Sequence, residues 1–318
     1  MPDWYNNSSR LKSDPMAKDN NKTKATISLL VEASEPASAR QNMEPPTLGA
    51  GQVVDAPSKS GGRVSQGSGA GRAIEILAVL RDQHMLVPGS ALGAMFQDEY
   101  RRIKRPLLSN AFGCSSSLVD HGNLVMVTSS IPGEGKTYTS TNLALSIARE
   151  KDVTVLLVDC DISRRGVSRL LQIEGYPGLV DVIENDDIGL GDVLLTTDIP
   201  HLRVLPAGRH CDYITELLAS KRMRELVEEI ASRYPDRFII FDSPPILATP
   251  ETQVLGNLVG QIVFVIETGK TPQSVVEDAI SSLPEDKAVG VVLNKNEGAA
   301  GRSGYYYGYY GAQPHSDD

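Results

Sequence analysis

The stretch VMVTSSIPGEGKTYTSTNLALSIA, residues 125–148, decides the fold of this chain. It opens with a run of apolar residues, passes through a loop that contains Gly133 and Gly135, and closes in a helical pattern. Backbone N–H groups of such a loop and of the following helix bind anionic phosphates. In the pattern G-x-x-x-x-G-K-[ST], the lysine reaches the β- and γ-phosphates and the next hydroxyl ligates Mg²⁺. Lys136 and Thr137 hold these positions, so the stretch predicts a strand, a phosphate loop and a helix.

The residues expected to surround the nucleotide are Ser130, Pro132, Gly133, Glu134, Gly135, Lys136, Thr137 and Tyr138. Ser130 stands where the pattern has its first glycine, which is a small departure. The alternative is a chance strand–turn–helix with a surface lysine, and the strand and helix patterns on either side of the loop argue against it.

Three aspartates follow apolar runs and are expected beside the loop. Asp159 and Asp161 close VLLVDCD, and Asp242 closes FIIFD. In an open α/β sheet the carboxyl ends of the strands face the ligand crevice, so the three side chains should converge near Lys136. Asp159 and Asp242, together with Thr137, are the expected Mg²⁺ ligands. Each aspartate on its own fits a simple turn cap, but two apolar runs that both end in aspartate after a GKT loop favour the metal site.

The chain after residue 124 alternates short apolar runs with helical stretches. The runs are LVMVTS, VTVLLVD, LRVLPAG, FIIFDS, QIVFVIE and AVGVVLN, and helices are expected over 137–150, 220–233 and 272–283. Strands that are apolar almost throughout are typical of a parallel sheet covered on both faces. We therefore expect a three-layer α/β domain of the P-loop NTPase type, with a mostly parallel central sheet, over residues 73–295.

The segments that flank this domain differ in composition. Residues 1–72 are expected to be a disordered linker, because only five of the 38 residues from 35 to 72 are large and apolar. The exception, ATISLLVEA at 25–33, is expected to form a transient helix. Residues 73–120 should be helical, with AIEILAVLRDQ as one helix and ALGAMFQDEYRRIKR as another that stops at Pro106. Residues 296–318 should form a flexible tail rich in glycine and tyrosine.

Composition limits the possible partners and the setting. The net charge of −9 argues against a general affinity for nucleic acid or anionic membranes. Three cysteines without paired spacing fit a reduced, cytoplasmic setting rather than a disulfide framework. The first residues have no apolar core of a signal peptide, and the apolar runs are shorter than the ~20 residues of a membrane span. A role at a membrane is therefore expected to need a partner.

The motifs SSIPGEGKT, LLVDCD and IIFDSPP together resemble the bacterial tyrosine kinases (BY-kinases), P-loop autokinases of polysaccharide synthesis and export. The resemblance covers residues 74–311. It points to the autokinases associated with exosortase-type exopolysaccharide loci, through EYRRIKRPLL, PDRFIIFDSPP and GYYYGYYG. It implies ATP and Mg²⁺ as cofactors and Lys136, Asp159 and Asp161 as catalytic residues, with one of the two aspartates accepting the phenolic proton.

Two positions depart from related patterns. The family has a basic residue two positions after the second aspartate, where this chain has Ser163 followed by Arg164 and Arg165. The related ATPases of division-site placement and plasmid segregation carry a lysine near the start of the loop, where this chain has Ile131. The missing lysine and the tyrosine tail favour the kinase over the ATPase.

The tail holds five of the eleven tyrosines, namely Tyr305, Tyr306, Tyr307, Tyr309 and Tyr310. The resemblance implies that they are the autophosphorylation sites and that a neighbouring subunit phosphorylates them. It also implies that Glu99, Arg102 and Arg105, which form a stripe on a helix, build a ring-type homo-oligomer. The spacing alone fits an ordinary intrahelical ion pair on a solvated face.

The implied partners are other copies of the chain, an inner-membrane chain-length regulator as activator and a cognate tyrosine phosphatase. The implied location is the cytoplasm, at the inner membrane through that partner. Two rival functions remain: a P-loop ATPase switch without kinase activity, and a nucleic-acid binder that stacks bases on the tail tyrosines. The acidic charge, and the absence of basic residues between the tyrosines, weigh against the nucleic-acid binder.

Overall fold

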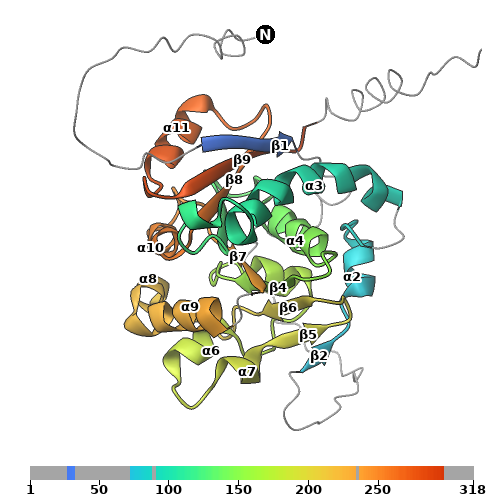
Figure 1. Cartoon of the computed structure of the whole chain (residues 1–318). Coiled ribbons are helices and arrows are strands. Elements are labelled where there is room, and N and C mark those ends of the chain that lie inside the picture. Colours follow the sequence, from blue (N-terminus) through green and yellow to red (C-terminus); the bar gives the residue numbers. More distant parts are fainter. Residues whose placement is uncertain (1–26, 33–71, 88–90, 234–235, 297–318) are drawn as a thin grey trace, which may run out of the picture.

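The computed structural model describes residues 27–32, 72–87, 91–233 and 236–296 (Figure 1). Within these ranges nine strands form one sheet in the order β1-β9-β8-β3-β7-β4-β6-β5-β2. The strands are β1 Ile27–Glu32, β2 Ala73–Ile74, β3 Leu124–Ser129, β4 Thr154–Asp159, β5 Leu195–Thr197, β6 Leu202–Leu205, β7 Arg237–Asp242, β8 Gln261–Glu267 and β9 Ala288–Asn294. Neighbouring strands pair in parallel except β5 and β6, so β5 and its parallel partner β2 run against the others.

The mostly parallel sheet expected from the sequence is confirmed. The six apolar runs became β3, β4, β6, β7, β8 and β9, while β1, β2 and β5 were not predicted. Strands β2 and β5 contain two and three residues, which is too short for an alternating pattern to appear.

The helices are α2 Leu77–Asp82, α3 Ala91–Phe112, α4 Lys136–Ile147, α5 Gly166–Leu170, α6 Leu179–Glu184, α7 Leu190–Val193, α8 Ile214–Ala219, α9 Lys221–Arg233, α10 Glu251–Leu258 and α11 Gln273–Ser281, with a short 3-10 helix at Ser116–Leu118. The three helices predicted after the phosphate loop are α4, α9 and α11, which confirms them with small shifts at their ends. None of the helices in the described ranges combines the length and apolar character that a membrane span requires.

Alternate residues of the central strands build two separate cores, as the period of a strand requires. Val125 and Val127 of β3 face the core that α2, α3 and α4 cover, whereas Leu124 and Met126 face the core under α6, α8, α9 and α10. These residues are fully buried on both sides of the sheet. The three-layer architecture is therefore confirmed.

The helix expected at 25–33 is wrong, because residues 27–32 form strand β1. This strand pairs in parallel with β9, from Ile27 opposite Val289 to Glu32 opposite Leu293. Without β1, strand β9 would present a row of unpaired backbone groups at the edge of the sheet, and pairing of this edge outweighs local helix propensity. The segment 1–72 thus contributes a strand, and the rest of it up to residue 71 lies outside the described residues.

Two expectations for 73–120 are corrected as well. The first helix begins only at Leu77, because Ala73–Ile74 form β2 and the Asp198 carboxylate accepts hydrogen bonds from the next backbone N–H groups, Ile76 and Leu77. The second helix, α3, does not stop at Pro106 but continues to Phe112. A proline inside a helix costs about 3 kcal/mol. Burial of the inner face of α3 outweighs this cost.

Candidate nucleotide-binding site

The carboxyl ends of three neighbouring strands meet at the phosphate loop. Strand β3, which leads into the loop, pairs with β7, and β7 pairs with β4. Asp159 at the end of β4 lies directly opposite Asp242 at the end of β7 in the register of the sheet. Both carboxylates are completely buried, and Asp161 is 3% exposed. The structure therefore brings the three predicted aspartates to the same edge as the loop.

Two glycines give the loop its shape. Gly133 and Gly135 have φ angles of 92° and 95°, which a residue with a side chain rarely adopts. Gly135 is also the residue before α4, so the backbone turns from the loop straight into the helix. Lys136 is the first residue of that helix and is 7% exposed. The amino end of α4 thus provides the N–H groups and the positive dipole end that bind phosphate.

The carboxylate of Glu134 fixes the loop to the rest of the sheet. Its oxygens accept hydrogen bonds from the backbone N–H of Ile131 at 2.8 Å and from the Thr271 hydroxyl at 2.6 Å. Asn294 at the end of β9 donates to the Glu134 carbonyl at 2.9 Å, and Lys295 donates to the Gly133 carbonyl at 2.6 Å. Thr271, Asn294 and Lys295 were missed from the sequence, because they lie over 130 residues away from the loop.

The Tyr138 ring is 1% exposed and belongs to the core beneath α4. Tyr138 therefore offers the nucleotide only its backbone, although the sequence pattern placed the residue among the nucleotide-binding set. The Ser130 hydroxyl is buried and has no hydrogen-bond partner among the described residues, and it lies at the start of the loop where the pattern has its first glycine.

Asp242 is held against the first turn of α4. Its Oδ2 accepts a hydrogen bond from the Thr137 hydroxyl at 2.8 Å, and its Oδ1 accepts one from the Ser140 hydroxyl at 3.0 Å. A Cβ atom on Gly166 would lie 2.5 Å from the Thr137 hydroxyl oxygen and 3.3 Å from Asp242 Oδ2. Only glycine allows α5 to approach this pair of oxygens so closely.

Burial raises the pKa of Asp242 to about 6, although the positive charge of Lys136 lowers it. Burial and the neighbouring charge of Asp242 raise the pKa of Asp159 to about 8. Asp159 Oδ2 accepts hydrogen bonds from the backbone N–H and the hydroxyl of Ser168, at 2.8 and 2.7 Å. Its Oδ1 has no hydrogen-bond partner among the described residues. A cation at this point would relieve the cost of two adjacent buried acids.

The oxygens of Thr137, Asp159 and Asp242 fit Mg²⁺, which prefers oxygen ligands and is usually bound by one or two carboxylates together with substrate phosphates. The unpaired Oδ1 of Asp159 is the observation that favours this fit. In the described ranges no three or more His, Cys, Asp or Glu side chains gather as a self-contained metal site.

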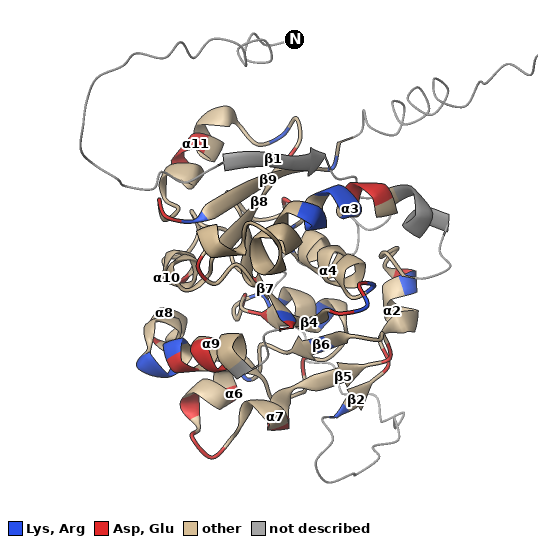
Figure 2. Cartoon of the chain, viewed as in Figure 1, with Lys and Arg blue, Asp and Glu red and all other residues tan. Residues whose placement is uncertain are grey.

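The three residues predicted to assemble subunits lie on α3, away from the loop. Arg102 and Arg105 are exposed, Glu99 is half-buried, and basic and acidic residues mix along this helix (Figure 2). Lys104 points the other way and binds the Ser146 carbonyl and the Glu150 carboxylate. The two arginines are therefore available on the outer face of α3. The predicted tail tyrosines lie outside the described residues.

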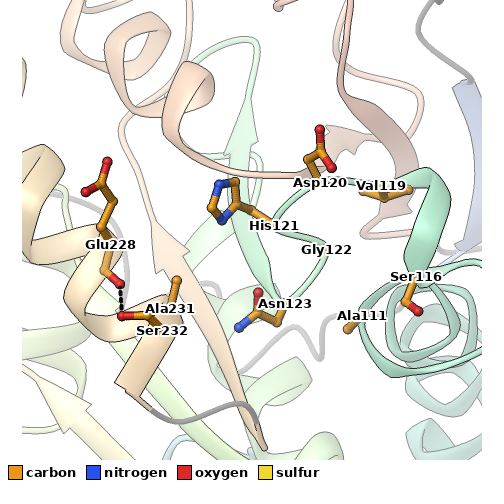
Figure 3. Close-up of a pocket in the computed structure, with 10 residues that line it drawn as sticks. All are labelled: Ala111, Ser116, Val119, Asp120, His121, Gly122, Asn123, Glu228, Ala231 and Ser232. Carbon is orange, nitrogen blue, oxygen red and sulfur yellow. Dashed lines mark hydrogen bonds between the residues drawn. The ribbon is translucent and has the colours of Figure 1, made fainter.

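A cavity of about 530 Å³ lies beside the amino end of β3, whereas the phosphate loop lies at its carboxyl end. His121 and Asn123, on the loop before β3, face Glu228 and Ser232 on α9 across it (Figure 3). This loop precedes the amino end of β3, whereas the phosphate loop follows its carboxyl end. The cavity is therefore separate from the nucleotide site.

Comparison with known proteins adds an independent line of evidence. Residues 123–266 match the AAA domain family. The chain is 36% identical over 191 residues to the tyrosine-protein kinase YwqD of Bacillus subtilis, which covers 59% of this chain and 78% of that protein. It is 32% identical over 181 residues to the tyrosine-protein kinase CpsD of Streptococcus agalactiae, covering 56% and 76%. The VpsO kinase domain superimposes with a TM-score of 0.55 at 28% identity, covering 64% of this chain and 98% of that structure.

Proposed function

This chain belongs to the bacterial tyrosine-protein kinase family, and we propose from that premise that it is an autokinase, which transfers the γ-phosphoryl group of ATP to the C-terminal tail tyrosines of another copy of the same chain. The observation that carries the proposal is the point at which the tail begins. Lys295 directly follows β9 and donates its hydrogen bond to Gly133 inside the phosphate loop. The tail that carries the tyrosines at 305–310 therefore begins, in the sequence, just after a residue that contacts the phosphate loop.

Nucleotide binding is assigned to Ser130 and to the loop residues from Pro132 to Thr137. The backbone N–H groups at the start of α4 hold the phosphates, and the ammonium group of Lys136 neutralises charge on the β- and γ-phosphates. Phosphoryl transfer depends mainly on positioning and on electrostatic stabilisation, so a nearly buried lysine at this point is well suited to the reaction.

Thr137, Asp159 and Asp242 would hold Mg²⁺, which when bound supplies positive charge at the transferring phosphoryl group. The protein orients each of these ligands. Ser168 fixes one oxygen of Asp159, the other oxygen has no donor among the described residues, and Ser140 holds Asp242 in place.

The transfer also requires a group that accepts the proton of the tyrosine hydroxyl. The tyrosine Oη forms a bond to the γ-phosphorus while the bond from that phosphorus to the β–γ bridging oxygen breaks, and ADP leaves. Because the phenol has a pKa of ~10, a carboxylate that takes its proton during the transfer favours the reaction. We assign this role to Asp161, whose Oδ1 accepts one long hydrogen bond from the backbone N–H of Arg164, at 3.2 Å. Asp159 is the alternative acceptor.

We further propose that subunits assemble through the exposed arginines of α3 and phosphorylate each other in trans. Arg102 and Arg105 form no ion pair within the described part of the chain, so both guanidinium groups can bind carboxylates of a neighbouring copy. Such an assembly would allow the phosphate loop of one subunit to act on the tail tyrosines of a neighbouring copy.

The resemblance of the motifs implies a role in exopolysaccharide synthesis or export, with an inner-membrane chain-length regulator as activator and a tyrosine phosphatase that resets the tail. We propose this setting for the chain. Fractionation of cells should find the protein at the membrane when that regulator is co-expressed and in the soluble fraction when it is not. Membrane association that does not depend on the regulator contradicts this setting.

Incubation of the purified protein with Mg-ATP, followed by a phosphotyrosine blot and peptide mapping, tests the proposed function. Phosphate on the tail tyrosines is the expected result. Hydrolysis of ATP without phosphotyrosine would instead identify an ATPase switch.

A further inference from the structure

Few large apolar side chains are exposed in the described part of the chain, and two of them flank the phosphate loop. The exposed set and their exposed fractions are Phe112 40%, Leu118 82%, Ile131 36%, Tyr213 54% and Leu247 43%. Ile131 lies in the loop itself, and Leu247 lies just after the end of β7, beyond Asp242. Single exposed apolar residues are ordinary, but two at the mouth of a phosphate site need a reason.

Both residues are held by the same part of β3. The Ser129 carbonyl accepts a hydrogen bond from the Ile246 backbone N–H at 2.8 Å, and the Ser129 hydroxyl donates to the Ile131 carbonyl at 2.9 Å. Glu134 holds the Ile131 N–H from the other side. Ile246 is 3% exposed, so it anchors its turn and leaves the next residue, Leu247, at the surface. The two apolar side chains therefore have fixed backbones on either side of Ser129.

An acceptor tyrosine has two different requirements at such a site. Its Oη must reach the γ-phosphate. Its ring is apolar, so the free energy is lower when the ring packs against an apolar surface than when it stays in water. The described groups that surround the phosphates are polar or charged. Ile131 and Leu247 are exposed apolar side chains whose backbones lie next to Ser129, where the chain enters the loop from β3.

The tail supplies the occupant. Twenty-two residues follow Asn296, and the first tyrosine of the cluster is nine residues beyond it. Nine extended residues span about 30 Å. The β7 and β9 ends are three strand spacings apart in the sheet, which is about 14 Å. The residues before the first tail tyrosine are thus long enough to span the distance from the end of β9 to the surface beyond β7.

We propose that Ile131 and Leu247 form the binding wall for the ring of the acceptor tyrosine, and that tail segment 305–310 occupies it. This inference rests on the proposed kinase activity and adds the residues that select a tyrosine. The wall favours an aromatic acceptor because serine and threonine have no ring to pack against it.

The test uses a chain whose five tail tyrosines are all changed to Ala, so that the tail offers the wall no ring and a synthetic peptide of residues 301–313 is the acceptor. In this background Ile131→Ser with Leu247→Ser should raise the KM for the peptide about tenfold, the effect of losing roughly 60 Å² of apolar contact. The KM for ATP should change less than threefold. Ile131→Val with Leu247→Met should restore the peptide KM to within about twofold of the parent, since both keep an apolar wall.

Leu118→Ser is the matched control, because it removes a more exposed leucine from the opposite edge of the sheet and should leave the peptide KM unchanged. If the serine double variant has an unchanged peptide KM, the proposal that Ile131 and Leu247 bind the acceptor ring is wrong. A lower oligomer mass with an unchanged peptide KM also overturns it, and places the two residues in a subunit interface. If the parent chain phosphorylates no peptide at all while it hydrolyses ATP, the proposed function itself fails.

Discussion

Replacing Asp159 with Asn should make the nucleotide-free, metal-free protein more stable while it abolishes Mg²⁺-dependent phosphorylation. In the folded protein, burial and the Asp242 charge raise the pKa of Asp159 to about 8, whereas an aspartate in the unfolded chain has a pKa of ~3.9. The folded state therefore binds the Asp159 proton more tightly than the unfolded state does. Stability from this group is complete below about pH 4 and is lost as the pH rises toward 8.

The size of the effect follows from the difference between the two pKa values. About four pH units at 1.36 kcal/mol each give an upper value of about 5 kcal/mol above pH 8. The asparagine recovers only part of it, since its amide nitrogen takes the place of the unpaired Oδ1 and costs about 1–3 kcal/mol if it finds no acceptor. We expect a net gain of about 2 kcal/mol at pH 8, or about 5 °C in Tm for a domain of this size.

Thermal unfolding in EDTA at pH 5, 6, 7 and 8 measures this gain. The Tm difference between Asp159→Asn and the parent should be negative at pH 5, should cross zero at pH ~6 and should be positive at pH 8, because the penalty for ionising Asp159 grows with pH while the cost of the asparagine stays constant. Asp152→Asn, which changes an exposed aspartate on the turn before β4, is the matched control and should give no pH-dependent difference. A variant that is less stable than the parent at pH 8, or a difference independent of pH, would refute the reasoning.

Three further predictions concern the reaction and the assembly. Lys136→Met should lower tail phosphorylation by roughly a hundredfold or more, because it removes the fixed cation at the phosphates; quantitative phosphotyrosine blots check this, and a rate near that of the parent would exclude the loop from the mechanism. Arg102→Ala with Arg105→Ala should give monomers in light scattering and slow autophosphorylation, and an intact oligomer would contradict the proposed α3 interface. Full phosphorylation of the tail adds about −8 to −10 charges, which is comparable to the starting net charge of −9. The phosphorylated oligomer should therefore dissociate in Mg-ATP, whereas a chain with Phe at all five tail tyrosines should stay assembled. If light scattering finds the same mass for the phosphorylated and the unmodified oligomer, charge repulsion is refuted.

The core of the fold could be predicted from the sequence because its strands are buried on both faces and are therefore continuously apolar. Strand β1 could not, because ISLLVE becomes a strand through its pairing with β9, about 260 residues later in the chain. The passage of α3 through Pro106 depends in the same way on burial against the core, which outweighs a local rule. In each case a tertiary contact decides, and local propensity does not record it.

In the candidate site, too, the sequence predicts the local features and misses the tertiary contacts. Lys136, Thr137 and the aspartates follow from a motif and from the position of strand ends, both of which are local features. The hydrogen bonds from Thr271 and Lys295 to the loop join residues that no spacing rule connects. The burial of the Tyr138 ring was also missed, since a helix start does not reveal which face turns inward.

The most direct measurement of trans autophosphorylation mixes two variants of the chain, one without the catalytic lysine and one without acceptor tyrosines. One chain carries Lys136→Met and keeps its tail tyrosines; the other has an intact loop and Phe at all five tail positions. With Mg-ATP, phosphotyrosine should form at residues 305–310 of the Lys136→Met chain, in the mixture but in neither protein alone. If the mixture consumes ATP and no tail tyrosine is modified, the proposed trans autokinase is wrong.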